Sequence, residues 1–174
     1  LGTINMPKRT GFSAGLLQVS AAAGITQIAP LSLDGTTSFT ATNGAITLDH
    51  ADNDFGGTLN AEGLSISLTD QNALSLGHVA TTGGDLNVIA GALTATQTLN
   101  VRGNLDLRTT NGDLSTNELH VSGDAYFTAL DGTGLRDISI TNANNQIDGS
   151  VSTDARNFTI RTASALSGNN LNVS

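Results

Sequence analysis

The stretch Leu99–Gly123, LNVRGNLDLRTTNGDLSTNELHVSG, begins and ends with nearly the same five residues. LNVRG starts at Leu99 and LHVSG at Leu119, and both read apolar, any residue, apolar, any residue, glycine. A close variant recurs upstream as LNAEG at Leu59 and VATTG at Val79. The four starts are equally spaced with a period of 20, which places four glycines in one register: Gly63, Gly83, Gly103 and Gly123. A fixed period of this length indicates a repeat protein.

Within each repeat, apolar residues alternate with polar ones over three to five positions, as at Leu105 and Leu107. Alternation with period two predicts short, half-buried β-strands, and the Gly, Asn, Asp, Ser and Thr between them favour turns. A unit this short cannot bury its few inward side chains alone, so it must stack on its neighbours. The sequence therefore predicts an all-β fold, a right-handed parallel β-helix (solenoid) with coils of about 20 residues. The right hand is expected because parallel crossovers nearly always have it.

A second repetition links ADNDFGGTL, residues 51–59, to ANNQIDGSV, residues 143–151. The positions that agree in character are the alanine, the asparagine two places on, an apolar residue and the last glycine. We expect the alanines and apolar residues to plug the core, the asparagines to occupy a corner and share side-chain amide bonds between coils, and the glycines to turn into the next strand. The pairs are Ala51/Ala143, Asn53/Asn145, Phe55/Ile147 and Gly57/Gly149.

Two coils are expected to be larger than the rest. Gly35 and Gly63 are further apart than one period, which indicates an enlarged coil between them. The later copy is also enlarged, and its extra residues fall in LDGTGLRD, residues 130–137, which we interpret as a loop. Residues 1–23 do not fit the register. Residues 1–174 are otherwise interpreted as a single β-helical segment, excised from a longer protein.

Composition narrows the range of partners. Charged residues make up 13% of the chain and the formal net charge is −8, which disfavours nucleic acid and anionic membrane surfaces. There is no run of apolar residues long enough to insert into a membrane. The chain has no cysteine, so disulfides and thiolate metal sites are excluded.

Residues able to support chemistry are sparse. Asp49, Asp52 and Asp54 could bind Ca²⁺ or position a sugar, but the later copy has Thr141, Asn144 and Gln146 there, which favours a solvated loop. His50, His78 and His120 occupy unequal places in the repeat and lack metal-ligand spacing. One period before and after Thr94 stand Leu74 and Leu114, so we expect no threonine ladder. The sequence predicts no catalytic residue, no metal and no cofactor.

The stretch from Gly24 to Gly168, including GITQIAPLSLDGTTSFTATNGAITLDHADNDFGGTLN, resembles the repeats of filamentous-haemagglutinin-type exoproteins. These are large adhesins of two-partner secretion and related autotransporter passengers. The resemblance implies a right-handed β-helical rod, secreted to the cell surface or outer membrane of a Gram-negative bacterium, with a role in adhesion, virulence or biofilm formation. The Asn-Pro motifs of that family's secretion domain are absent, as is Arg-Gly-Asp, because Asn104 follows Arg102-Gly103.

The sequence is compatible with two classes of function. The first is a non-catalytic stalk of a surface adhesin, whose partners would be a glycan or protein of a host or neighbouring cell, or further copies of itself in fibres. The alternative is a β-helix that binds or degrades a polysaccharide. An enzyme should gather acidic and basic groups in a groove on one face, whereas a stalk should spread its charges.

Overall fold

The computed structural model describes residues 4–6, 9–12, 15–163 and 166. In this part of the chain every regular element is a β-strand, and no helix has the length and apolarity that crossing a lipid bilayer requires. The first sheet is parallel and contains one strand from each coil. Its strands are β1 (Ile4–Met6), β4 (Ile25–Gln27), β7 (Ile46–Leu48), β10 (Ile66–Thr69), β12 (Leu86–Ala90), β15 (Leu105–Thr109), β18 (Ala125–Asp131) and β22 (Val151–Asp154).

Two further sheets complete the coils. The second sheet contains β3 (Leu17–Ala21), β6 (Thr37–Ala41), β9 (Thr58–Gly63), β11 (Ala73–Thr81), β13 (Ala92–Ala95), β14 (Leu99–Val101), β16 (Leu114–Thr116), β17 (Leu119–Val121), β20 (Asp137–Ile140), β21 (Gln146–Ile147) and β23 (Asn157–Ile160). The third sheet contains β2 (Arg9–Phe12), β5 (Leu31–Leu33) and β8 (Asp54–Phe55). A short strand, β19 (Gly134–Leu135), pairs antiparallel with β18.

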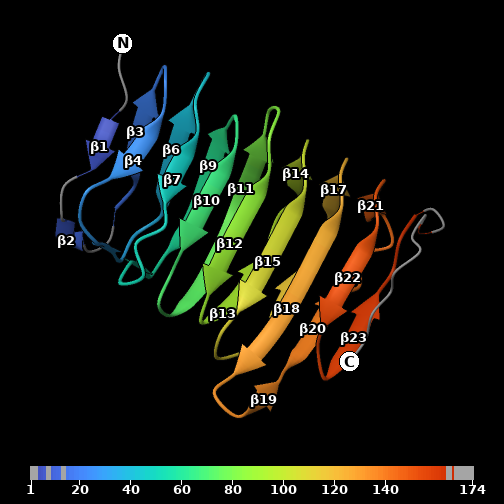
Figure 1. The fold of residues 1–174 in the computed structure, drawn as a ribbon. Helices are drawn as coiled ribbons and strands as arrows, with labels where there is room; N and C mark the ends of the chain where they lie inside the picture. The colour runs from blue at the N-terminus through green and yellow to red at the C-terminus, as the bar shows by residue number, and fades with distance from the viewer. Residues whose placement is uncertain (1–3, 7–8, 13–14, 164–165, 167–174) are drawn as a thin grey trace.

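The chain winds around a three-sided coil. Figure 1 shows the first sheet in front, with β12, β15 and β18 running downward, and β9, β11 and β14 running upward behind it. Successive coils are added from the N-terminal end on the left to the C-terminal end on the right. A chain that descends in front, rises behind and advances to the right winds as a right-handed screw. The predicted right-handed parallel β-solenoid is therefore confirmed.

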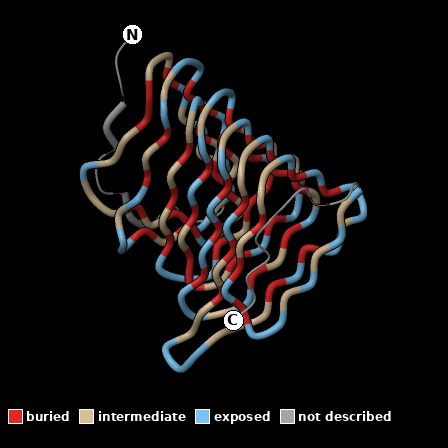
Figure 2. Tube along the Cα trace, turned by 45° about the vertical axis from the view of Figure 1, so that its right-hand side comes forward, coloured by how far each residue is buried: buried red, intermediate tan, exposed pale blue. Residues whose placement is uncertain are grey.

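Like residues of neighbouring coils lie over each other. In the first sheet Ile46, Ile66 and Leu86 are successive partners, each one period from the next. In the second sheet Leu99 pairs with both Val79 and Leu119. These side chains are all buried, and Figure 2 shows buried positions recurring at the same places in successive coils. The core is thus a column of stacked aliphatic and aromatic side chains inside the tube.

The period of 20 fails at one of the predicted steps. Leu59 does not pair with Val79; it pairs with Leu76, and Val79 pairs with Ala61. The register shifts between Leu76 and Val79, where β11 has a bulge. A bulge adds a residue to one strand without ending the ladder, so a count of fixed intervals misses it.

The two expected large coils differ in size. Gly35 lies against Gly57 rather than Gly63. In the same coil Thr37 pairs with Leu59, so this coil is longer than the period by only two residues. In the later copy Val121 pairs with Ile147, which exceeds the period by six. The extra residues form the hairpin of β18 and β19, in which Leu130 pairs with Leu135. Figure 1 shows this hairpin projecting from the lower edge of the solenoid.

The region whose register was uncertain joins the same architecture in its described part. β3 pairs with β6 along its full length, from Leu17 with Thr37 to Ala21 with Ala41, one period apart. β1 extends the first sheet beyond β4. Across the first sheet, seven strand-to-strand steps of about 4.8 Å give an axial length of about 34 Å.

Candidate functional site

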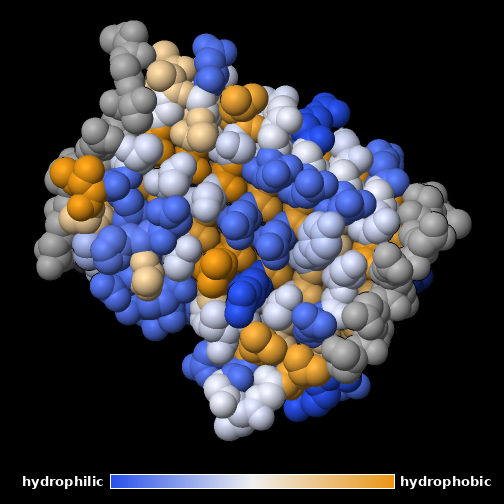
Figure 3. Space-filling model, viewed as in Figure 1, coloured by the Kyte–Doolittle hydropathy of each residue, from blue (hydrophilic) through white to orange (hydrophobic). Residues whose placement is uncertain are grey.

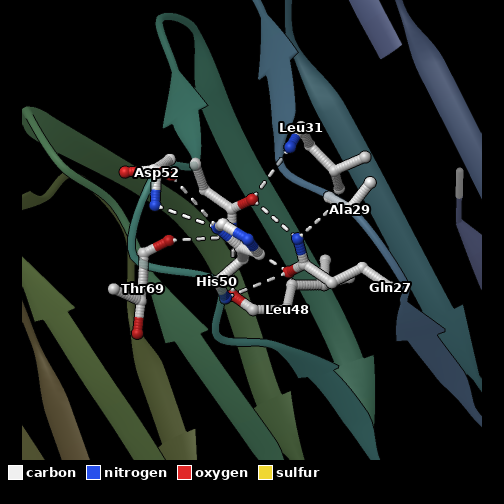
Figure 4. A network of polar contacts seen from close by, with 8 residues as sticks. Gln27, Ala29, Leu31, Leu48, His50, Asp52 and Thr69 are labelled. Carbon is white, nitrogen blue, oxygen red and sulfur yellow. Dashed lines mark hydrogen bonds and ion pairs between the residues drawn. The ribbon is translucent and has the colours of Figure 1, made fainter. Parts of the chain in front are cut away.

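The asparagine of the first repeated motif is a buried connector. Asn53 is 0% exposed, at the corner between β7 and β8. Its Oδ1 accepts a hydrogen bond from the Leu31 amide of the preceding coil (2.9 Å), and its Nδ2 donates to the Leu48 carbonyl of its own coil (3.1 Å) and the Thr69 carbonyl of the next (3.1 Å). One side chain therefore joins three coils, as Figure 4 shows from close by.

Gln27 completes this network. Its Nε2 donates to Asn53 Oδ1 (2.8 Å), and its Oε1 accepts from Asn53 Nδ2 (2.9 Å). The expected sharing of amide bonds between coils thus exists, but between asparagine and glutamine rather than between stacked asparagines. The reason is that Asn53 and Asn145 belong to coils that are not neighbours.

The later copy repeats the arrangement. Asn145 is also 0% exposed. Its Oδ1 accepts from the Leu119 amide (2.8 Å), and its Nδ2 donates to the carbonyls of Ile140 (3.2 Å) and Arg161 (2.8 Å). These three partners correspond to Leu31, Leu48 and Thr69 in the sequence repetition. The repeated motif is therefore a structural device that pairs backbone groups at a corner, where no strand can pair them.

The apolar residues of the motif divide into two kinds. Phe55 and Ile147 are buried, at 1% and 3% exposure. Ala51 and Ala143, by contrast, are exposed, so the prediction that they plug the core is wrong. The cause is local, because the Asn53 amide donates to the His50 carbonyl (3.1 Å) and closes a turn with Ala51 at its outer end.

Two of the repeated glycines allow close approach between coils. A Cβ on Gly123 would lie 2.7 Å from the carbonyl oxygen of Gly103, and a Cβ on Gly103 would lie 2.7 Å from the carbonyl carbon of Gly84. The amides of Gly123 and Gly103 donate to the carbonyls of these same neighbours, both at 3.0 Å. Gly83, which the period of 20 selected, is displaced from this stack by one position, and Gly84 takes its place.

A buried carboxylate supports the same corner from the next coil. Asp70 is 3% exposed and accepts hydrogen bonds from the amides of Phe55 (2.6 Å) and Asn72 (2.7 Å). Burial raises the pKa of Asp70 above its ordinary value, although both hydrogen bonds act in the opposite direction. Because the pKa of Asp70 is higher in the folded chain, the charged carboxylate lowers the free energy of unfolding at neutral pH. This destabilisation disappears as the pH falls below the pKa that Asp70 has in the unfolded chain.

The candidate metal ligands do not form a site. In the part of the chain that the structure describes, no three His, Cys, Asp or Glu side chains are grouped so that they could hold a metal ion. This applies to the three candidate aspartates, of which Asp49 and Asp52 are exposed and Asp54 is half-buried. Among the histidines, His50 Nδ1 accepts from the Asp52 amide (3.1 Å), and His120 Nε2 lies 2.7 Å from Glu118 Oε1. His78 is exposed.

An outward row of hydroxyls runs through Thr94, although it is not a ladder of threonines. Thr94 pairs with Ser75 and with Ser115. The interval from Ser75 to Thr94 is one residue shorter than the period, and the interval from Thr94 to Ser115 is one residue longer. The leucines exactly one period away are therefore its inward neighbours. Further pairs extend the row in both directions. The complete row is Thr58, Ser75, Thr94, Ser115, Ser139 and Thr159. The expectation that Thr94 belongs to no threonine ladder therefore holds, but a mixed ladder of serine and threonine hydroxyls forms, and its unequal intervals concealed it from a count by the period.

A groove lies on the outer surface of the second sheet, over β11, β14, β17 and β21. Its volume is about 520 Å³. The lining is mostly polar and includes Asn100, Arg102, His120, Gln146 and Asp148. Three of these are consecutive partners in the ladder, since His120 pairs with both Asn100 and Gln146. The groove therefore brings together side chains that are able to bind a ligand.

The family described as repeats of unknown function (DUF5649) matches three stretches of the chain, residues 9–62, 63–115 and 96–154. Together they cover well over half of the sequence. The chain belongs to this family. In these DUF5649 repeats, the first match contains Asn53 and the third contains Asn145. No curated protein and no solved structure matches the chain significantly.

Sequence reasoning missed three features of these DUF5649 repeats. Gln27 bonds Asn53, and Asp70 bonds the Phe55 amide at the same corner. Neither has a counterpart in the later copy, where Ser115 and Thr162 occupy the corresponding positions. Comparison of the two copies could therefore not reveal them. The groove was missed because its residues come from different coils. The sequence signal that could have found it is the set of planar polar residues at 100, 120 and 146, one coil apart.

Proposed function

We propose that this segment is a non-catalytic spacer, or stalk, in a secreted adhesin on the surface of a Gram-negative bacterium. The observation that carries the proposal is the unbroken parallel ladder of the first sheet. Every coil pairs with the one before it and adds the same inward side chains, so length grows with the number of coils. The resemblance of residues 24–168 to filamentous-haemagglutinin-type repeats supports the adhesin setting.

The surface also supports a role without catalysis. Hydrophilic side chains are spread over the face seen in Figure 3. The ion pair of Arg156 with Asp137 is formed by residues outside the groove of the second sheet. The groove on the second sheet is lined by one carboxylate, Asp148, whereas hydrolysis of a glycosidic bond ordinarily uses a pair of carboxylates on either side of it.

Removal of one whole coil tests the spacer role. Leu86 in β12 and Leu105 in β15 are ladder partners. Deletion of residues 86–104 therefore joins Asp85 to Leu105, and β15 takes the place of β12 in the same register. The variant should fold cooperatively and lose about 4.8 Å of axial length, measured by small-angle X-ray scattering. Deletion of residues 86–95, half a coil, is the matched control and should unfold the chain. Equal tolerance of both deletions would contradict a stack of registered coils.

Surface location and lack of catalysis are tested separately. Antibodies raised against the chain should label intact cells of the source organism, and external protease should remove the label. Labelling that requires permeabilised cells would contradict a surface protein. Incubation with a panel of plant, bacterial and animal polysaccharides should release no new reducing ends, and sustained release would establish the enzymatic alternative instead.

A further inference from the structure

The groove on the second sheet has a lining with a defined chemical character. Asn100, His120 and Gln146 form one outward row across three coils, with neighbours about 4.8 Å apart. Arg102 and Asp148 follow Asn100 and Gln146 by two positions, just beyond the ends of β14 and β21. The groove therefore presents amide, imidazole, guanidinium and carboxylate groups together, which provide both donors and acceptors of hydrogen bonds.

Part of this lining is already fixed and part is available. Glu118 holds the imidazole of His120 (2.7 Å), and Gln146 Nε2 donates to Asp148 Oδ1 (3.2 Å). The side chains of Asn100 and Arg102 make no hydrogen bond or ion pair within the described part of the chain. One wall of the groove is thus pre-oriented, while the other offers planar polar groups to an external partner.

We propose that this groove binds a neutral oligosaccharide lying along the solenoid axis, across β14, β17 and β21. A volume of about 520 Å³ falls within the usual range for small-ligand sites. The groove has no aromatic or large aliphatic side chain apart from valines, which disfavours an apolar ligand. In the groove the carboxylate of Asp148 offsets the guanidinium of Arg102, and Glu118 contacts His120, so the groove has no excess of positive charge; together with the net charge of −8 this disfavours a polyanion. Vicinal hydroxyls of an uncharged sugar match neighbouring donors and acceptors without charge repulsion.

The test uses the whole chain and a matched pair of variants. The probe is a microarray of neutral, sialylated and sulfated oligosaccharides, followed by calorimetric titration with the best neutral binder. Asn100→Ala/Arg102→Ala removes the available side of the groove. Asn87→Ala/Arg108→Ala removes the same residue types from outward positions of the first sheet, on β12 and β15. Both variants should keep the wild-type unfolding temperature, because all four side chains point outward.

The wild type should bind neutral probes. Asn100→Ala/Arg102→Ala should weaken that binding about tenfold or more, as expected from losing two or three hydrogen bonds, while Asn87→Ala/Arg108→Ala should not change it. The proposal is overturned by absence of neutral binding, by binding restricted to sialylated or sulfated probes, or by equal effects of the two variants. If the coil deletion behaves as expected while no glycan binds, the spacer role stands and the assignment of the groove falls.

Discussion

Asn53 and Asn145 explain why this chain contains the same short motif twice. A corner of a solenoid interrupts the strand ladder, and backbone groups there would be buried without partners. A fully buried asparagine supplies one acceptor and two donors, so it can serve the amide of the coil before and the carbonyls of its own coil and the coil after. The neighbouring motif positions face solvent and vary freely between the copies.

Replacement of Asn53 by alanine should therefore be costly. Asn53→Ala leaves the Leu31 amide and the carbonyls of Leu48 and Thr69 without their partner. Each buried group left unpaired costs about 1–3 kcal/mol, so the free energy of unfolding should fall by about 3 kcal/mol or more. Urea denaturation followed by circular dichroism measures this loss. The exposed Asn144 is the matched control, and an equal effect of Asn144→Ala would refute the connecting role.

The glycine stack leads to a second prediction at single residues. Gly123→Ala would place a Cβ 2.7 Å from the carbonyl oxygen of Gly103, so adjacent coils must move apart. We expect destabilisation of about 1–3 kcal/mol, the usual cost of overpacking. Gly132, at the hairpin tip, has no atom within 4 Å of an added Cβ, and Gly132→Ala should change stability by less than about 0.5 kcal/mol. Thermal unfolding of the two variants distinguishes these cases, and similar midpoints would argue against close coil contact at Gly123.

At the scale of elements, the strands define the solenoid and the insertions decorate it. The hairpin of β18 and β19 adds residues to one coil without disturbing the ladder, because Ala125 to Thr128 still pair with Val151 to Asp154. The insertion in LDGTGLRD was predicted from the sequence, since the copies change offset there. Its antiparallel pairing was not, because the segment has no alternation of apolar and polar residues.

Deletion of the hairpin tip should be tolerated. Removing residues 131–134 shortens the interval from Val121 to Ile147 until it equals the one found between Thr37 and Leu59. The ion pair of Asp131 with Arg136, both partly exposed, is lost, and ion pairs at the surface contribute about 0–1 kcal/mol. The unfolding temperature should fall by only a few degrees. Deletion of residues 105–108, a segment of the same length, removes most of β15 and should abolish folding, so comparable stability of both would contradict the assignment of insertion and ladder.

The last coils are joined by a polar contact that should depend on pH. Asp137 in β20 accepts two hydrogen bonds from Arg156 (both 2.9 Å) and one from Asn157 (2.9 Å), and these hold the pKa of Asp137 below its ordinary value. Because the pKa of Asp137 is lower in the folded chain than in the unfolded chain, the charged carboxylate stabilises the fold at a pH above the unfolded pKa, near 3.8. This stabilisation is lost as the pH falls through the pKa of Asp137 in the folded chain. Asp137→Asn should therefore lose less stability than wild type between pH 6 and pH 2. Parallel curves of unfolding temperature against pH would contradict this.

At the scale of the whole molecule, the two copies of the motif do not lie above each other. The first copy follows β7 of the first sheet, whereas the second follows β20 of the second sheet. The strand after the motif also changes sheet, from β9 in the second sheet to β22 in the first, so the later copy is turned around the axis relative to the first. Repetition in sequence therefore marks equivalent local geometry, not equivalent position in the stack.

The overall fold could be predicted from the sequence, whereas the exact partners of many residues could not. Period-two alternation and a constant interval between like residues were sufficient for the fold, because stacked coils need like residues at like places. They were insufficient for exact partners wherever a bulge, as between Leu76 and Val79, or alternating intervals, as around Thr94, shifted the register. The groove depends on side chains that meet only after the register is set.

In a stack of registered coils, the axial distance between two residues of one row grows by one strand spacing per coil, whatever the number of residues in the coil, and distances between spin labels measure this growth. Thr47, Asp106, Tyr126 and Ser152 belong to one outward row of the first sheet, and the native chain has no cysteine to interfere. Label pairs at Thr47→Cys with Asp106→Cys, Tyr126→Cys or Ser152→Cys span three, four and five coils. Pulsed electron double resonance should give narrow distributions that lengthen by about 4.8 Å at each step, from about 14 Å through about 19 Å to about 24 Å between backbones. Distances that follow the unequal sequence separations, or broad overlapping distributions, would contradict the solenoid.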